Sequence, residues 1–502
     1  MWGKQTKKIT AATFVDYLAQ GHAGCQCGWS SIQTWGTTLS RIHKDPATLC
    51  PIAHVADQDA AYCTAVVAEA VKAAAELRAM TGRTKAALLQ RWFELMNDAD
   101  NDLCRIITRE NGKPLAEAQG EVKYASEFLW WFAGEAQRLN GQVISSSNAG
   151  HRVVTIKQPI GVAGLVTPWN FPAAMVMRKV GAALAAGCPC VLKLAAETPL
   201  TAIALAELAR RAGFPAGSFS VVTTMAHTIE VGKVLTQHPD IRKFSFTGST
   251  AVGKLLAAQC TSTVKRTSME LGGNAPFLVF DDAESNLEKV VEGIMQSKFR
   301  LSGQTCVCAN RVYVQAGIHD RLVQALQDRV KALVVGPGED PKTTLGPLIS
   351  GKAVSKVLAH VQDACMNGAT LLVGGRRPEG LSESFCEPTL LVNVKADSLC
   401  AREETFGPLL PIIKFDTEVD VIKMANSVPV GLAAYFFTGN IAQAWRVAEA
   451  MKVGMVGVNT GLISDPATPF GGVKESGEGR EGSTLGVEEY IETKSITINI
   501  DP

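Results

Sequence analysis

Two short motifs contain residues suited to covalent catalysis. Cys306 lies in the small and polar stretch 302–308 (SGQTCVC), where a tight turn could present a reactive thiolate. Upstream, the carboxylate of Glu270 is followed by two glycines in 270–273 (ELGG). A thiol nucleophile with a separate carboxylate base favours a mechanism in which activated water hydrolyses a covalent intermediate. The alternative role of a cysteine is that of a small buried hydrophobe, which we expect for most of the thirteen.

Length and composition indicate a soluble protein of more than one domain. A chain of 502 residues is too long for a single hydrophobic core. With 46% hydrophobic and 19% charged residues it is an ordinary globular sequence, and its net charge of +1 gives no attraction to nucleic acid or to an anionic membrane. The longest apolar runs are interrupted by glycine and proline and are too short to span a bilayer.

Cysteine usage favours a reducing compartment. The number of cysteines is odd, they are sparse, and no clear signal peptide precedes them, so we expect a cytoplasmic location. Lys4, Lys7 and Lys8, with no acid before Asp16, weakly resemble an organellar presequence and keep a mitochondrial location as the alternative. Three Cys-x-Cys pairs lack the paired spacing of a zinc site, so we expect no metal.

Short apolar runs alternate with amphipathic stretches and predict an α/β fold. The predicted strands are 162–166, 190–193, 219–222 and 241–246, and the predicted helices between them are 173–186, 200–212 and 229–235. This alternation predicts a parallel sheet with helices on both faces. The pattern resumes at 277–280 and continues to about residue 458, which predicts a second α/β unit in series.

Two further stretches alternate polar and apolar residues, as strands at a sheet edge do. They are 152–157 (RVVTIK) and 495–500 (SITINI). Long exposed edges need cover, and another subunit could supply it, so we expect a homodimer or homotetramer.

Residues 246–254 (FTGSTAVGK) follow a strand and open a helix, as a phosphate-binding turn does. Small residues there allow backbone N–H groups and the helix N-terminus to contact a phosphate. The stretch is not the usual dinucleotide fingerprint, and Leu255 replaces the hydroxyl residue of a magnesium-nucleotide loop. A plain strand-to-helix turn remains an equal alternative at this stage.

Five motifs occur in one order along the chain: 168–172 (PWNFP), 246–250 (FTGST), 270–273 (ELGG), 303–306 (GQTC) and 403–408 (EETFGP). In this order they resemble the aldehyde dehydrogenase superfamily. Within it the chain is similar to the succinate-semialdehyde dehydrogenases, through 110–118 (ENGKPLAEA), 297–300 (SKFR) and 469–477 (PFGGVKESG). The resemblance runs from about residue 45 to the C-terminus.

The resemblance implies a Rossmann-type cofactor domain, an α/β catalytic domain and a small β oligomerisation element. The implied boundaries are a divergent extension at 1–28, the cofactor domain at 29–141 and 163–272, the catalytic domain at 273–474, and oligomerisation strands at 142–162 and 487–502.

The resemblance also implies roles for three catalytic residues. Cys306 attacks an aldehyde as a thiolate, while the Asn170 amide and the Cys306 N–H hold the oxyanion. After hydride transfer to the nicotinamide, Glu270 activates the water that hydrolyses the thioester. By the same resemblance the cofactor contacts are Trp169, Lys193, Ala196, Gly248, Ser249, Glu404 and Phe406.

Ala196 bears on the choice of dinucleotide. Many relatives that prefer NAD have a glutamate at this position, whose carboxylate would bind the ribose hydroxyls and repel a 2′-phosphate. Alanine there favours NAD(P) with NADP preferred, although the neighbouring Glu197 could oppose this preference. Leu194 also replaces the proline common in the subfamily.

By resemblance, Arg178, Arg300 and Ser464 bind the distal carboxylate of a short semialdehyde such as succinate semialdehyde. Asp465 and Leu301 depart from the pattern of the subfamily. A carboxylate at 465 that pointed inward would oppose an acidic substrate, and Leu301 is more apolar than expected beside Arg300. A neutral or aromatic aldehyde therefore stays open, as do a coenzyme A-acylating enzyme and a non-catalytic protein of the same fold. Cys308 adds the hypothesis of a Cys306–Cys308 disulfide that switches activity off.

Overall fold

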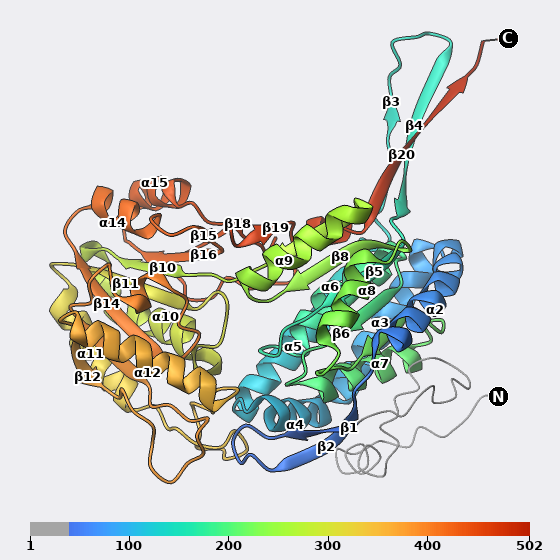
Figure 1. Cartoon of the computed structure of the whole chain (residues 1–502). Helices are drawn as coiled ribbons and strands as arrows, with labels where there is room; N and C mark the ends of the chain where they lie inside the picture. Colours follow the sequence, from blue (N-terminus) through green and yellow to red (C-terminus); the bar gives the residue numbers. More distant parts are fainter. Residues whose placement is uncertain (1–39, 502) are drawn as a thin grey trace.

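The computed structural model describes residues 40–501, so the extension expected at 1–28 lies outside the described residues. Two α/β bodies lie side by side, and a narrow arm of strands projects from the first of them (Figure 1). A separate hairpin of β1 (Ser40–Lys44) and β2 (Pro51–Ala56) lies at the N-terminal end of the described chain. Among residues 40–501, no helix has the length and apolar character needed to cross a membrane.

The first body is built on a six-stranded sheet with the order β19-β9-β8-β5-β6-β7. All its strands are parallel except the last to be added, β19, so the predicted parallel sheet is confirmed. Its strands are β5 (Val162–Val166), β6 (Cys190–Lys193), β7 (Phe219–Val222), β8 (Ile241–Thr247), β9 (Arg266–Glu270) and β19 (Gly477–Glu478).

Helices cover both faces of this sheet. Successive strand residues point to opposite sides, so each strand contributes side chains to both layers. Val162 packs with α2 (Ala60–Ala79) and α8 (Thr228–Gln237), whereas Ala163 faces the other layer. The first face also carries α9 (Thr250–Cys260), and the second carries α3 (Gly82–Asp98), α4 (Asp100–Asn111), α5 (Leu115–Glu135), α6 (Ala174–Ala186) and α7 (Pro199–Ala212).

The second body is built on a seven-stranded sheet with the order β12-β13-β14-β11-β10-β16-β17, in which only β12 is antiparallel. Its strands are β10 (Ala275–Val279), β11 (Ala309–Gln315), β12 (Thr370–Val373), β13 (Thr389–Val392), β14 (Leu409–Phe415), β16 (Ala433–Phe437) and β17 (Met455–Val458). One face packs on α10 (Leu287–Phe299) and α11 (His319–Lys331), and the other on α12 (Gly351–Met366), α13 (Leu399–Arg402), α14 (Glu418–Ala425) and α15 (Ile441–Ala450).

The chain does not run through the two bodies simply in series, as the sequence predicted. After the second sheet, β18 (Val473–Lys474) pairs with β15 (Val430–Gly431), and β19 then returns to the first sheet. There Gly477 lies opposite Glu270 of β9. The two sheets are therefore linked at the end of the strand that carries the candidate base.

The arm consists of β3 (Val143–Ile144), β4 (His151–Pro159) and β20 (Ile491–Asn499), which follows α16 (Ser483–Glu488). The prediction that 152–157 forms an edge strand is wrong, because β4 is the central strand of the order β20-β4-β3. The C-terminal strand does lie at an edge. Several apolar side chains of the arm are exposed: Val143, Ile144, Ile156, Ile496, Ile498 and Ile500.

Candidate active site

The loop that carries Cys306 begins with three residues in the left-handed region. Leu301, Ser302 and Gly303 have φ values of 50°, 52° and 77°, a conformation that costs a non-glycine residue about 1–2 kcal/mol. Two contacts hold it: the Glu117 carboxylate accepts the Leu301 N–H at 2.9 Å, and the Ser302 hydroxyl donates to the Gly346 carbonyl at 2.7 Å. The turn sets the direction in which the chain enters Cys306.

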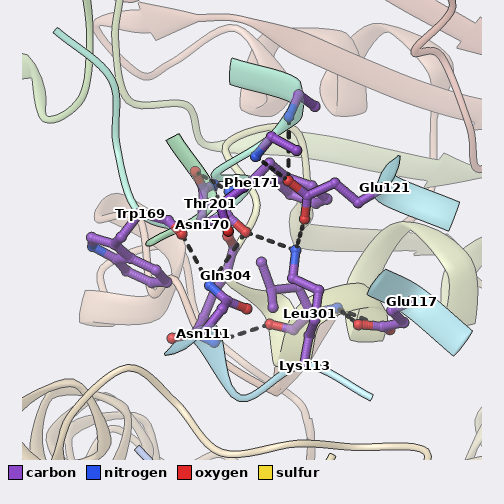
Figure 2. Close-up of polar contacts among 12 residues, drawn as sticks. Asn111, Lys113, Glu117, Glu121, Trp169, Asn170, Phe171, Thr201, Leu301 and Gln304 are labelled. Carbon is purple, nitrogen blue, oxygen red and sulfur yellow. Dashed lines mark hydrogen bonds and ion pairs between the residues drawn. The ribbon is translucent and has the colours of Figure 1, made fainter. Parts of the chain in front are cut away.

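Asn170 lies in the turn between β5 and α6 and reaches across to this loop. Its side-chain amide donates to the Gln304 carbonyl at 3.0 Å, and its side-chain oxygen accepts the Phe171 N–H at 3.1 Å. Figure 2 shows the Asn170 side chain between its neighbour Phe171 and Gln304, which comes from the loop before Cys306. A buried amide held at both ends has a fixed orientation, which an oxyanion donor requires.

A buried ion pair supports the Asn170 turn from below. Lys113 forms a completely buried ion pair with Glu121 and donates to the Asn170 carbonyl at 2.9 Å (Figure 2). The other Glu121 oxygen accepts the Ala173 N–H at 2.8 Å, at the N-terminus of α6. Through these contacts the pair joins α5 to the turn. Removing one partner would leave the other charge buried and unpaired, so the pair is held in place.

Asn111 completes the support. Its amide donates to the Trp169 carbonyl at 3.0 Å, one residue before Asn170. Sequence reasoning missed Asn111, Lys113, Glu117 and Glu121 as positioning residues. The motif 110–118 contains the first three of them, and Glu121 follows just after it; the structure buries residues 110–114 and Glu121.

Cys306 is half-buried, with its backbone closely packed. A Cβ added at Gly273 would lie 2.5 Å from the Cys306 carbonyl oxygen, so only glycine allows the β9–β10 turn to cross here. Burial raises the pKa of the Cys306 thiol to about 12, and the positive charge of Arg178 opposes this shift. The Cys306 N–H donates no hydrogen bond to any residue among 40–501 and is free for a ligand.

Glu270 is a buried carboxylate at the end of β9. Neither of its oxygens has a hydrogen-bond partner within the described part of the chain. A Cβ at Gly471 would lie 2.8 Å from one of these oxygens. Burial, and then the charge of Glu481, raise the pKa of Glu270 well above its usual value, while Lys179 and Arg178 act in the opposite direction. A buried, unpartnered carboxylate is the expected state of a general base.

Three of the predicted cofactor residues lie together beside this pair. The rings of Trp169 and Phe406 meet edge to face, with centroids 5.6 Å apart. The Glu404 carboxylate accepts the Gly273 N–H at 3.3 Å, and burial raises its pKa to about 7. Its charge also acts on the Cys306 thiol, so Glu404 lies on the cysteine side of the site.

The other cofactor residues lie at the carboxyl ends of the parallel strands, where α/β sheets bind ligands. Gly248 and Ser249 form the turn from β8 into α9, and the Ser249 side chain does not cap the helix. The backbone N–H groups at the N-terminus of α9 are therefore open to a phosphate. Lys193 ends β6 and forms no ion pair with any residue that the structure describes. An uncapped helix N-terminus and an unpaired cation fit a dinucleotide.

The two predicted substrate arginines have different surroundings. Arg178 is buried on α6, 3.6 Å from the centre of the Phe470 ring and 3.7 Å from a Glu481 oxygen, so its charge is partly neutralised. Arg300 is half-buried 5.3 Å from the centre of the Phe171 ring and has no carboxylate within 4.0 Å among residues 40–501. Glu481 is a further residue that the sequence did not reveal.

Ser464 is half-buried in the loop after β17, and among the residues described it forms no hydrogen bond with either arginine. The neighbouring Asp465 is exposed, and its carboxylate accepts the Ala467 N–H at 2.8 Å. The Asp465 carboxylate therefore bonds within its own loop and does not point inward.

Cys308 is buried, and its thiol lies 3.7 Å from the Lys298 carbonyl oxygen. Both Cys306 and Cys308 are free thiols. The disulfide switch stays a prediction, and it would require the Cys308 side chain to leave this contact.

The comparisons with known proteins come from sequence and from structure. The profile of the Aldehyde dehydrogenase family matches residues 37–496. "Succinate-semialdehyde dehydrogenase [NADP(+)] 1" of Schizosaccharomyces pombe is 54% identical over 83% of each chain, and "Glutarate-semialdehyde dehydrogenase" of Pseudomonas putida is 51% identical over 91% of this chain and 94% of its own. The crystal structure of succinate-semialdehyde dehydrogenase from Burkholderia pseudomallei superposes with a TM-score of 0.90 at 48% identity, covering 92% of this chain and 95% of the other.

The raised pKa of Cys306 predicts slow alkylation at neutral pH. We expect iodoacetamide to modify Cys306 about tenfold faster for each unit of pH above 7, with no plateau below about pH 9, because only the thiolate reacts. Peptide mass spectrometry measures the rate, with the exposed Cys365 as an internal reference and Cys306→Ser as the blank. A plateau between pH 6 and 8 would contradict this prediction, because it would mean that the thiolate is already formed.

Proposed function

The chain belongs to the aldehyde dehydrogenase family, and on that premise we propose that it oxidises succinate semialdehyde to succinate with NADP. The observation that carries this proposal is the convergence of the Cys306 thiol, the unpartnered Glu270 carboxylate and the oriented Asn170 amide in one site. Two arginines beside it supply positive charge for an acidic substrate.

The residues of the chain divide the reaction into two steps. Cys306 Sγ attacks the aldehyde carbon, and the Asn170 amide and the Cys306 N–H stabilise the negative oxygen, each such donor lowering the barrier by about 3–4 kcal/mol. The bound nicotinamide supplies the hydride acceptor. Glu270 then takes a proton from water, which attacks the resulting thioester and releases the acid and the Cys306 thiolate.

Burial makes Glu270 suited to this role. A carboxylate whose pKa is raised is, in its ionised form, a stronger base toward water. A coenzyme A-acylating enzyme has no need of such a base, and a non-catalytic protein has no need to bury it without partners. Both alternatives are therefore disfavoured by Glu270.

Arg300 is the cation best placed to bind a distal carboxylate, since no carboxylate within 4.0 Å among the described residues neutralises it. The name of the Pseudomonas putida relative raises glutarate semialdehyde, one methylene longer, as the second candidate substrate. One methylene changes specificity by only about 10–200-fold, so both are to be assayed. The outward position of Asp465 weakens the case for neutral aldehydes.

The choice of NADP is supported by Ala196 and by the printed name of the fission yeast relative. A cytoplasmic location is supported by the described cysteines, all of which are free thiols.

We propose that the arm pairs with a second copy of the chain. A three-stranded sheet projecting from the protein buries little of its own apolar surface (Figure 1). Val143 is 84% exposed, and Ile498 of the outer strand and Ile500 just after it are each 48% exposed, which an isolated subunit would leave in water. Either a homodimer or a homotetramer would cover these exposed side chains.

The direct test measures absorbance at 340 nm with each aldehyde and each dinucleotide. We expect NADP reduction with succinate semialdehyde, at a kcat/KM at least about tenfold above that for hexanal or benzaldehyde, because a paired carboxylate adds charged hydrogen bonds. Equal rates with neutral aldehydes would refute the substrate assignment. A requirement for coenzyme A would indicate the acylating alternative, and no reaction with any aldehyde the non-catalytic one.

Replacing the proposed base separates the two steps. We expect Glu270→Gln to give a burst of about one NADPH per site, followed by turnover about 100-fold slower than in the parent, because acylation survives and hydrolysis does not. Stopped-flow absorbance measures both phases, and Cys306→Ala should show neither. If Glu270→Gln showed no burst, and the burst and the steady-state turnover fell equally, a role limited to hydrolysis would be contradicted.

Arg300→Met tests the carboxylate contact. We expect the KM for succinate semialdehyde to rise about 10–100-fold, while the KM for hexanal, which has no carboxylate, changes less than about threefold. Steady-state kinetics with both aldehydes on the same preparation supply the internal control. Parallel losses for the two substrates would mean that Arg300 supports the fold of the loop.

A further inference from the structure

The N-terminal hairpin brings an arginine to the sheet edge that binds the dinucleotide. Arg41 lies on β1 opposite Val55 of β2. The end of β2 is tied to the loop after β7, because the Thr223 hydroxyl donates to the Ala56 carbonyl at 2.7 Å and the Gln58 N–H donates to the Thr223 carbonyl at 2.8 Å. The hairpin is therefore fixed beside the carboxyl ends of the neighbouring strands β6 and β7.

Arg41 reaches from this hairpin into the loop that follows β6. Its guanidinium donates to the Ala196 carbonyl and lies 3.8 Å from the Met225 sulfur. Its Nε is buried and has no partner within the described part of the chain. An arginine with such spare donors is equipped to bind an anion.

The carboxylates of Asp57, Glu197 and Glu110 act on the charge of Arg41, but among residues 40–501 none forms an ion pair with it. Asp57 is engaged by three other donors, of which the Thr224 hydroxyl and the Met225 N–H each lie at 2.9 Å. Glu197 is exposed. Among residues 40–501, neither carboxylate comes within 4.0 Å of the guanidinium, although the charges of both act on it.

A second cation shares this position. Lys193 ends β6, and burial lowers its pKa while Glu197 raises it and the charge of Arg41 lowers it further. Two cations held together in a partly buried place repel each other, and an anion between them removes that repulsion. Ala196, where a carboxylate would have blocked such an anion, lies in the same loop.

We infer that Arg41, together with Lys193, binds the 2′-phosphate of NADP, so that the N-terminal hairpin helps to select the dinucleotide. This rests on the dinucleotide site of the proposed function but not on the aldehyde. The planar guanidinium can offer two parallel N–H groups to a phosphate, which a lysine cannot.

Direct binding tests the inference without any aldehyde. Adenosine 2′,5′-bisphosphate and 5′-AMP differ by the 2′-phosphate alone, and isothermal titration calorimetry gives a Kd for each. We expect Arg41→Met to weaken binding of the bisphosphate about 10–100-fold and to leave 5′-AMP within about twofold. Arg41→Lys should fall between the parent and Arg41→Met, because it retains the charge and loses the fork.

Lys44→Met is the matched control, since Lys44 is an exposed cation on the same strand. It should leave both affinities unchanged, and thermal unfolding should show that all variants are folded. Equal weakening of the two ligands, or no change with Arg41→Met, would overturn the inference. If the parent binds the bisphosphate no more tightly than 5′-AMP, no 2′-phosphate site exists. Failure of the aldehyde assay with normal selectivity for the bisphosphate would count against the proposed substrate only.

Discussion

The hydrogen bond from the Asn170 amide to the Gln304 carbonyl joins the two α/β bodies at the place where the chemistry is proposed. Asn170 belongs to the turn after β5, and Gln304 to the loop before Cys306, so each body contributes one side of the contact. The geometry of the pocket depends on keeping these two turns in register. The buried Lys113–Glu121 pair and the hydrogen bond that the Leu301 N–H donates to Glu117 do this from α5 and the segment before it, and thereby hold both turns against the same helix.

Burial sets the electrostatics of the site and creates a conflict that the cations partly relieve. Cys306, Glu270 and Glu404 all have raised pKa values because each is removed from water. Arg178 favours the ionised forms of Cys306 and Glu270, but Glu481 opposes ionisation of Glu270 and pairs with Lys179 and Arg178. The result is a site in which burial favours the neutral forms of all three acids, and the nearby cations favour the ionised forms that a nucleophile and a base require.

The sequence predicted the elements of the first sheet closely, because glycine marks their ends. The helices before Gly187 and Gly213 stop there since both glycines adopt the left-handed conformation, with φ of 94° and 99°. It could not predict that β4 is a central strand, because polar alternation is the same at an edge and in an exposed arm. Nor could it predict the return of β19, which is two residues long and has no pattern of its own.

The candidate site was predictable where a motif carried a functional group, and not where a group acts through another. Cys306, Glu270 and Asn170 stand in short motifs with glycine or proline, and the structure brings them together, although their roles stay predictions. Glu481 and Arg41 lie in no such motif. Their surroundings arise from contacts with residues that lie about 150 or more positions away in sequence, such as Ala196, and no local pattern records them.

The arm also bears on the active site, because its central strand continues into the strand that presents Asn170. β4 ends at Pro159 and β5 begins at Val162, and the Ile160 N–H between them donates to the Tyr490 carbonyl at 3.0 Å, just before β20. A second subunit that covered the exposed isoleucines of the arm, as proposed above, would restrain β4 and β20 together. That restraint would pass into β5, which leads into the turn of the proposed oxyanion donor Asn170, so association of subunits and order of this turn would stabilise each other.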